Sequence, residues 1–204
     1  MMSDRWIPLD VESCDADPFV QFRRWFDEAS DEMADRNVIT LVTASLDARP
    51  SARMVLLRHV DDTSFGWFTN YASRKGEELS ANPVAALSWY CEPLGRQVRI
   101  EGSVARMSDE ESDAYFNARP RGHQLGAHAS AQSHPIASRA ELERRVREMD
   151  EQFAGRSVPR PLNWGGYRLT PDRFEFWQHR LDRLHDRIVY TLDGATWRRE
   201  RQSP

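Results

Sequence analysis

The sequence predicts a mainly β fold of the α+β class, in which an antiparallel β-barrel carries flanking helices. Three observations lead to this prediction. About seven short runs of β-branched and aromatic residues occur at short intervals, separated by turn-forming residues. Helix-capping patterns lie between these runs. With 204 residues and 40% apolar content, the chain is long enough for one domain with a sizeable core.

The first half of the chain begins with a helix and continues in strands. Asp17 and Pro18 form a cap followed by a first-turn proline, and apolar residues then recur at helical spacing from Phe19 to Met33. After Asn37 the composition changes to the β-branched and aromatic runs that are typical of strands. We expect strands at residues 38–43, 53–58, 65–69, 84–91 and 97–107, and a short helix over residues 73–81.

The second half contains two helices and then returns to strands. Capping boxes at residues 108–111 and 138–141 each place a serine hydroxyl at the cap and a glutamate three residues later. Residues 119–135, between them, are rich in turn formers and histidine, which predicts a long functional loop. Asp193 and Gly194 separate two alternating runs and predict a hairpin. The expected C-terminal strands are residues 166–169, 174–177, 187–192 and 197–201.

Composition and charge exclude several classes of protein. The formal net charge of −4 indicates no bulk attraction to nucleic acid. No stretch approaches the roughly 18 apolar residues of a membrane span, and the acidic start lacks a signal-peptide pattern. Cys14 and Cys91 are too few for a disulfide framework and lack metal-ligand spacing. We therefore expect a cytoplasmic protein without a bound metal, in which a flexible segment, residues 1–16, precedes a single domain, residues 17–204.

Lys75 is the only lysine among the 28 basic residues of the chain. Such an arginine bias usually reflects the base composition of the coding DNA. On that interpretation, the position of the one remaining lysine is a matter of chance. Lys75 nevertheless lies in the segment Ser-Arg-Lys-Gly of residues 73–76. Since lysine binds phosphate as a compact point charge, the alternative to chance is a site that needs an ammonium group.

Other cations lie at the ends of the expected strands or in the turns that join them, where a barrel builds its binding sites. Arg53 and Arg58 flank an apolar run, and a separation of five positions on a regular strand places them on opposite faces. We therefore expect Arg58 to serve a different ligand from Arg53, unless each is an ordinary solvated strand end. The remaining cations of this kind are Arg74, Arg183 and Arg187.

Eight short segments are informative as an ordered set. They are residues 53–58, 68–70, 73–76, 96–98, 132–133, 164–167, 175–178 and 183–187. In sequence, order and spacing they resemble the flavin-binding elements of the pyridoxine/pyridoxamine 5′-phosphate oxidase family. The most specific part is Glu175-Phe-Trp-Gln178 followed by Arg183-Leu-His-Asp-Arg187, and the resemblance runs from about residue 18 to the C-terminus.

The resemblance implies a split β-barrel that binds flavin mononucleotide (FMN) at the interface of a homodimer. A dianionic phosphate binds convergent cations, and a flavin ring binds amide donors against an aromatic wall. By position, the residues that contact the flavin phosphate and ribityl tail would be Arg53, Arg74, Lys75, Gln132 and Ser133. Those that contact the chain and ring would be Thr69, Gln97, Trp177 and Arg187, and the flavin-binding segments also contain Met54, Val55, Leu56 and Phe68.

The same resemblance implies oxidation of pyridoxine 5′-phosphate or pyridoxamine 5′-phosphate to pyridoxal 5′-phosphate. Arg183 and His185 would lie over the pyridine ring, near the carbon that gives hydride to flavin N5, and O2 would reoxidise the flavin. Taken singly, Tyr115 and Trp177 also suit plain core aromatics, and His185 suits a structural histidine. The residues expected to bind the substrate phosphate are Arg58, Tyr115, Arg119 and His123.

Several substrate positions depart from the family pattern, whereas every flavin position is retained. Arg58, His123 and His128 stand where the family usually has lysine, a small polar residue and tryptophan. Residues 179–181 replace a glycine-rich stretch, and residues 1–8 lack the Arg-x-x-Tyr segment that often covers the substrate. Two alternatives therefore stay open: an FMN-dependent oxidase of another aromatic intermediate, such as a reduced phenazine precursor, and a non-catalytic flavin-binding protein.

Overall fold

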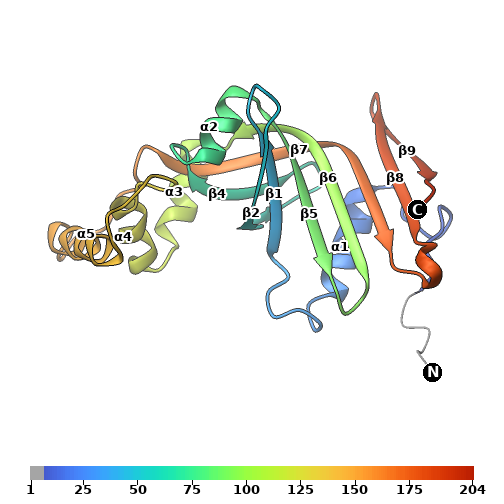
Figure 1. Ribbon diagram of the computed structural model, residues 1–204, viewed down its shortest axis with the longest axis horizontal. Helices are drawn as coiled ribbons and strands as arrows, with labels where there is room; N and C mark the ends of the chain where they lie inside the picture. The colour runs from blue at the N-terminus through green and yellow to red at the C-terminus, as the bar shows by residue number, and fades with distance from the viewer. Residues whose placement is uncertain (1–6) are drawn as a thin grey trace.

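The computed structural model describes residues 7–204, and a nine-stranded antiparallel sheet that curls into a half-barrel forms its centre (Figure 1). Its strands are β1 (Val38–Ala44), β2 (Pro50–Leu56), β3 (His59–Val60), β4 (Phe65–Asn70), β5 (Val84–Cys91), β6 (Arg96–Arg106), β7 (Trp164–Gln178), β8 (Asp186–Asp193) and β9 (Thr196–Arg201). The helices are α1 (Pro18–Glu28), α2 (Arg74–Ala81), α3 (Asp109–Asn117), α4 (Arg121–Ala129) and α5 (Arg139–Gln152), with a 3-10 turn at Leu181–Arg183. This architecture confirms the predicted fold class.

β7 is the longest strand and connects the two parts of the sheet. One of its edges pairs with β6, and the other pairs first with β4 and then with β8. The prediction of two separate strands here, residues 166–169 and 174–177, is wrong. The register of β6 shifts between Glu101 and Gly102, opposite Pro171. A bulge accommodates a proline, which donates no ladder hydrogen bond, so β7 continues through it.

One face of the sheet packs against α1. The backbone N–H of Phe19 donates a hydrogen bond of 2.7 Å to the Asp17 carboxylate, which fixes where the helix begins. The ring of Phe22 lies 4.9 Å from that of Phe65 on β4 and 6.1 Å from that of Trp89 on β5. α1 therefore confirms the predicted first helix, although it ends at Glu28 and not at Met33, and it supplies the main core with aromatic rings.

The other face of the sheet exposes apolar side chains. Met54 on β2 is 60% exposed, and Tyr90 on β5 is 49% exposed. On the same face, Gln97, Trp177 and Arg187 lie side by side, because they are register partners across β6, β7 and β8. Exposed apolar groups beside polar ones are typical of a surface that another protein chain covers.

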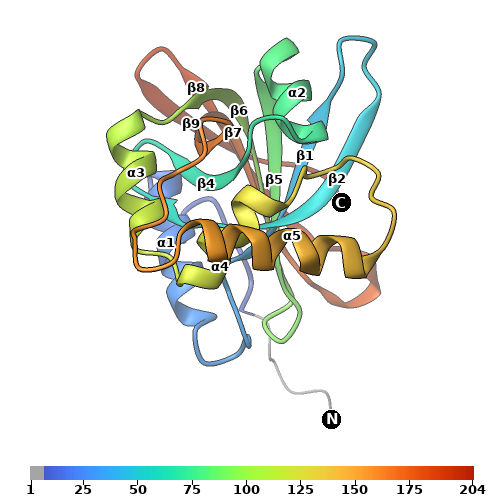
Figure 2. The same cartoon turned by 90° about the vertical axis from the view of Figure 1, so that its left-hand side faces the viewer.

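Helices α3, α4 and α5 form a second, smaller core at one end of the molecule (Figure 1 and Figure 2). The prediction of a long loop over residues 119–135 is wrong, because residues 121–129 form α4. The glycine, proline and histidine content of this stretch indicates turns. However, Leu125 is buried in the same cluster as Phe116 and Trp164, and this tertiary packing outweighs local preference.

Residues 7–16 lie along β8 and β9. The Leu9 N–H donates a hydrogen bond of 3.1 Å to Asp186, and Arg199 donates one of 2.6 Å to the Cys14 carbonyl. The predictions of a flexible segment over residues 1–16 and of a missing cover over residues 1–8 fall partly on residues 1–6, which lie outside the described residues. Within residues 7–204, no helix is long and apolar enough to cross a membrane.

We expect Gly102→Ala to destabilise the protein by about 1–3 kcal/mol, the usual cost of overpacking. A Cβ at this position overlaps the Thr170 carbonyl oxygen and lies 2.7 Å from the Cα of Pro171. Gly126→Ala is the matched control, since its Cβ would meet nothing within 4 Å and alanine favours a helix interior by about 1 kcal/mol. Urea denaturation at one fixed protein concentration measures both. A wild-type midpoint for Gly102→Ala would contradict the close packing at the bulge.

Candidate functional site

A cavity of about 280 Å³ opens beside the ends of β2 and β4 and the start of α2. A second cavity of about 440 Å³ adjoins it, because the two share Arg119, His123, Gln132 and Trp164 as lining residues. Apart from Trp164, every residue that lines the first cavity is one that the sequence predicted to bind the cofactor or the substrate. These residues are Arg53, Met54, Val55, Leu56, Arg58, Phe68, Thr69, Lys75, Tyr115, Arg119, His123 and Gln132.

Lys75 lies in the first turn of α2, and its side chain is buried. Its ammonium group donates hydrogen bonds to Thr69 Oγ1 and Ser73 Oγ, both at 3.2 Å, and to Gln132 Oε1 at 3.0 Å. Burial, followed by the nearby charge of Arg53, lowers the pKa of Lys75 to about 8. Because these three acceptors are neutral, the cation is held in place without being neutralised by them and can bind an anion.

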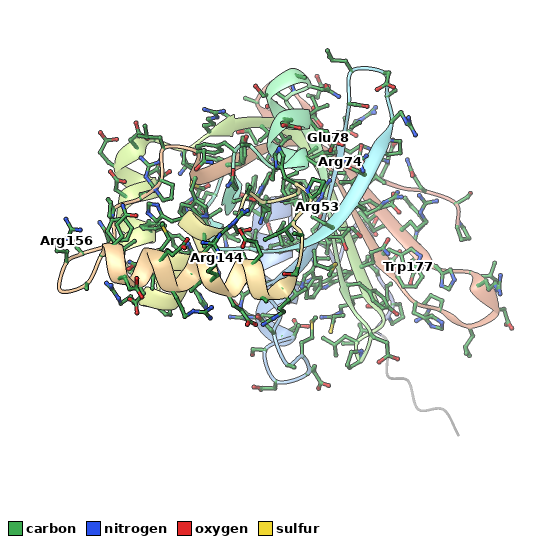
Figure 3. The ribbon with its side chains drawn as sticks, turned by 60° about the vertical axis from the view of Figure 1, so that its left-hand side comes forward. Arg53, Arg74, Glu78, Arg144, Arg156 and Trp177 are labelled. Carbon is green, nitrogen blue, oxygen red and sulfur yellow. The ribbon has the colours of Figure 1, made fainter. Side chains whose placement is uncertain are left out.

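Arg53 and Arg74 lie next to Lys75 and share one carboxylate, Glu78 (Figure 3). Arg53 donates hydrogen bonds to the hydroxyls of Thr43 and Ser51, both at 2.5 Å. Burial lowers the pKa of Arg53, whereas the charge of Glu78 raises it. We call Arg53, Arg74 and Lys75 the phosphate cradle, because three convergent cations suit a phosphate group.

Arg58 and Arg119 supply further positive charge to the same cavity. Arg119 Nη1 is buried and has no hydrogen-bond partner among the described residues, while the guanidinium group lies 4.6 Å from the centre of the Trp164 ring. Burial lowers the pKa of Arg119. A buried N–H donor without a partner is costly, so the structure favours an anion at this position.

The sequence placed Arg53 and Arg58 on opposite faces of one strand, but both line this cavity. β2 ends at Leu56, so the alternation of a regular strand does not reach residue 58.

An aromatic wall completes the cavity. Phe68 stacks on Tyr115 with ring centres 3.8 Å apart and planes 7° apart, and Trp164 stacks on the pair.

A second group of predicted residues lies on the exposed face of the sheet. Gln97, Trp177 and Arg187 are neighbours across three strands. Arg187 donates two parallel hydrogen bonds, of 2.8 and 3.0 Å, to Glu175, which is 3% exposed. Figure 3 shows Trp177 well apart from Arg53 and from the other labelled residues of the cradle. One chain therefore presents two separate groups of predicted site residues.

Arg183 and His185 extend this second group. The His185 ring lies 4.6 Å from the Trp177 ring, and its Nδ1 accepts a hydrogen bond of 3.1 Å from the backbone N–H of Arg180. Burial, and then the charges of His179 and Arg183, lower the pKa of His185 and favour the neutral ring. Since Nδ1 accepts, the proton of the neutral ring lies on Nε2.

Two predicted site residues adopt backbone conformations that are unfavourable for side chains. Ser133 has φ of 72° and Arg183 has φ of 61°, both in the left-handed region. Such conformations cluster at functional sites. Ser133 is exposed beside Gln132 and does not line either cavity described above.

Three site residues received no role from the sequence: Glu78, Trp164 and Glu175. Glu78 follows Arg74 by four positions on a helix, a spacing that indicates an ion pair. Glu175 precedes Trp177 by two positions on a strand, which places both on one face. Trp164 stands in a segment that carried the family resemblance, but nothing local indicates that its ring stacks on Phe68.

Residues 26–153 match a family model described as pyridoxamine 5′-phosphate oxidase, and residues 164–204 match one described as the pyridoxine 5′-phosphate oxidase C-terminal dimerisation region. The chain belongs to the pyridoxamine 5′-phosphate oxidase family. Two relatives named pyridoxine/pyridoxamine 5′-phosphate oxidase, one from Rubrobacter xylanophilus and one from Paraburkholderia phymatum, are each 54% identical to this chain. The alignments cover 96% of this chain and 91% and 93% of those relatives.

Two solved structures show the same fold. PhzG from Burkholderia lata, in complex with tetrahydrophenazine-1-carboxylic acid, is 30% identical with a TM-score of 0.89, over 97% of this chain and 98% of PhzG. A pyridoxamine 5′-phosphate oxidase-related, FMN-binding protein from Nostoc punctiforme is 17% identical with a TM-score of 0.72, over 92% and 97% of the two chains. The second likeness supports the fold alone.

The pKa of Lys75 predicts how binding of FMN depends on pH. Lys75 is charged below about pH 8 and neutral above it, whereas a phosphate monoester is a dianion throughout that range. We therefore expect FMN affinity to fall as the pH rises from 7 to 9.5, measured by quenching of flavin fluorescence. Lys75→Ala should bind FMN roughly ten- to a hundredfold more weakly at pH 7 and lose most of this fall. Equal wild-type affinities at both pH values would contradict the assignment.

Proposed function

We propose that this chain is an FMN-dependent oxidase that converts pyridoxine 5′-phosphate or pyridoxamine 5′-phosphate to pyridoxal 5′-phosphate, with O2 as the electron acceptor. The observation that carries this proposal is the distribution of charge in one cavity. Arg53 and Lys75 of the phosphate cradle line this cavity and supply cations for one phosphate, and Arg58 and Arg119 supply cations for a second. A phosphorylated cofactor and a phosphorylated substrate together need two such sets.

The described residues fit FMN. The buried ammonium group of Lys75 donates its hydrogen bonds to neutral oxygens, so its charge is available to a terminal phosphate. We propose that the phosphate and ribityl tail bind Arg53, Arg74, Lys75, Gln132 and Ser133, with Thr69 beside them. Residues 54–56 and Phe68 would line the flavin, and Gln97, Trp177 and Arg187 would contact its chain and ring. When bound, FMN supplies the acceptor for hydride at N5.

The chain forms a homodimer, since residues 164–204 match the dimerisation region of its family. We propose that FMN lies at the interface of the two subunits. This is supported by the separation of Arg53 and Arg74 from Trp177 within one chain (Figure 3). The second group lies on an exposed sheet face with apolar side chains such as Met54, which a partner subunit would cover.

For the substrate, we propose that Arg58, Tyr115, Arg119 and His123 bind the phosphate group. Arg119 contributes the buried N–H that has no partner in the described residues. Arg183 and His185 would come from the partner subunit and lie over the pyridine ring. The backbone N–H of Arg180 holds His185 as a neutral ring with its proton on Nε2, which orients it as a hydrogen-bond donor.

The cytoplasm is the proposed location of the enzyme, because Cys14 and Cys91 are buried free thiols.

A second candidate substrate is a reduced phenazine precursor, since PhzG shares the fold with a TM-score of 0.89. The vitamin B6 phosphates are favoured because the relatives named for them share 54% identity, against 30% for PhzG. Retention of Arg183 and His185 argues against a flavin-binding protein without activity.

We expect Arg119→Ala to raise KM for pyridoxine 5′-phosphate by about one to two orders of magnitude, the loss of a charged hydrogen bond, with FMN content unchanged. Arg121→Ala is the control, because Arg121 pairs with exposed Asp150 outside both cavities. Oxygen uptake with both B6 phosphates and a reduced phenazine precursor measures the activities. Full FMN loading with turnover of the phenazine precursor alone would contradict the proposed function.

A further inference from the structure

Glu78 is a buried carboxylate at the centre of a group of cations, and the proposed reaction does not use it. The side chain is 7% exposed and projects from α2 toward β1 and β2. Burial raises its pKa, but hydrogen bonds from Ser51, Thr43 and Arg74 and the charge of Arg53 outweigh this and hold the pKa at about 2. Glu78 is therefore ionised wherever the protein is folded and active.

Both oxygens of this carboxylate are in use. Oε1 accepts a hydrogen bond of 2.9 Å from Arg74 Nε, and Oε2 pairs with Arg53 Nη2 at 3.4 Å. Oε2 also accepts hydrogen bonds from the hydroxyls of Thr43 and Ser51, which themselves accept from Arg53. One buried group thus fixes an arginine from a strand and an arginine from a helix in a single arrangement (Figure 3).

Glu78 also sets the charge of the cradle. Three cations and one carboxylate give a net charge of +2. Without the carboxylate, a net charge of +3 would lie in a partly buried space, and the ammonium group of Lys75 would be the first to lose its proton. A net charge of +2 matches a phosphate monoester dianion.

We propose that Glu78 is a positioning residue for the cofactor phosphate: it orders Arg53 and Arg74 before FMN binds and keeps Lys75 protonated. This inference rests on the proposed function, because it requires that the cradle binds the FMN phosphate. Arg74 is otherwise largely exposed, with 62% of its side chain accessible, and its hydrogen bond to Glu78 holds it close to Arg53, which pairs with the same carboxylate. Preorganised cations bind a phosphate without a further cost of ordering.

The charged and titratable groups that face Lys75 come from several elements. Arg53 on β2 lowers its pKa, and Glu78 on α2 raises it. Removal of the Glu78 charge therefore lowers the pKa of Lys75. As the pH rises, FMN affinity then begins to fall at a lower pH than in the wild type. The other charged or titratable residues that line this cavity are Arg58, Tyr115, Arg119 and His123, and Arg74 precedes Lys75 in α2 and pairs with Glu78.

The test is the dissociation constant of FMN for Glu78→Gln, measured from pH 6.5 to 9.5 by flavin fluorescence on protein freed of cofactor. An amide has one acceptor oxygen in place of two, so it can hold only one of the two arginines. We expect binding to weaken by about tenfold at pH 7 and its decline to begin at lower pH than in the wild type. Glu77→Gln is the matched control, because it removes the same charge from the same turn of α2 at an exposed position.

Two results would overturn the inference. Unchanged affinity and pH profile in Glu78→Gln would show that the carboxylate positions nothing. Tighter binding would show that it only repels the phosphate. Circular dichroism checks that the variant is folded. If it is not, Ser51→Ala replaces it: this change removes one hydrogen bond to Glu78 without altering the charge, and wild-type affinity would again overturn the inference.

Failure of the proposed function gives a different result. In that case the wild-type protein itself does not bind FMN, and no comparison of variants is needed. A double-mutant cycle of Glu78→Gln with Arg74→Gln tests whether Glu78 affects FMN binding through Arg74. If Glu78 acts through Arg74, Glu78→Gln weakens FMN binding less in the Arg74→Gln background than in the wild type. Additive effects would exclude this route.

Discussion

The length and pairing of β7 constrain the rest of the site. The strand begins at Trp164 in the wall of the cavity and continues to Trp177 on the exposed sheet face. At about 3.3 Å per residue, the thirteen steps between them span roughly 40 Å along the strand. β6 pairs with β7 from Tyr167 to Gln178, with one register shift at Glu101 and Gly102. The group of Trp177 and Arg187 lies on the exposed face of the sheet, and we propose that a second copy of the chain brings it to the flavin bound at the cradle.

Buried carboxylates organise the cations in both groups. Glu78 joins the two arginines of the cradle, and Glu175 holds Arg187 through two parallel hydrogen bonds and also pairs with Arg99. In each group, the buried carboxylate reduces the repulsion between the cations that contact it. Breaking a buried ion pair is costly, so these acids also fix where the cations lie. The only lysine of the chain takes the position where a compact charge reaches three neutral oxygens.

Much of the fold could be predicted from local patterns, because strand alternation, helix caps and turn residues act over short distances. Most strands, α1 and the capped helices were found in this way, whereas β3 was not predicted and β7 was predicted as two strands. Helix α4 was missed because its stability comes from burial of Leu125, which no local signal reveals. The site was predicted through ordered segments, yet the shared cavity of Arg53 and Arg58 depends on where β2 ends. The role of Glu78 depends on contacts across 25 to 35 residues of sequence, which one sequence alone does not indicate.

A mixed dimer tests most directly whether two chains complete each flavin site. Lys75→Ala removes the cradle cation from one chain, and Arg187→Ala removes the ring contact from the other. Neither homodimer should hold FMN tightly. In a mixed dimer, isolated with different affinity tags, the intact cradle of one chain faces the intact Arg187 of its partner. The account predicts one tightly bound FMN per mixed dimer. A mixed dimer that binds FMN as poorly as both homodimers would contradict it, because each site would then lie within a single chain.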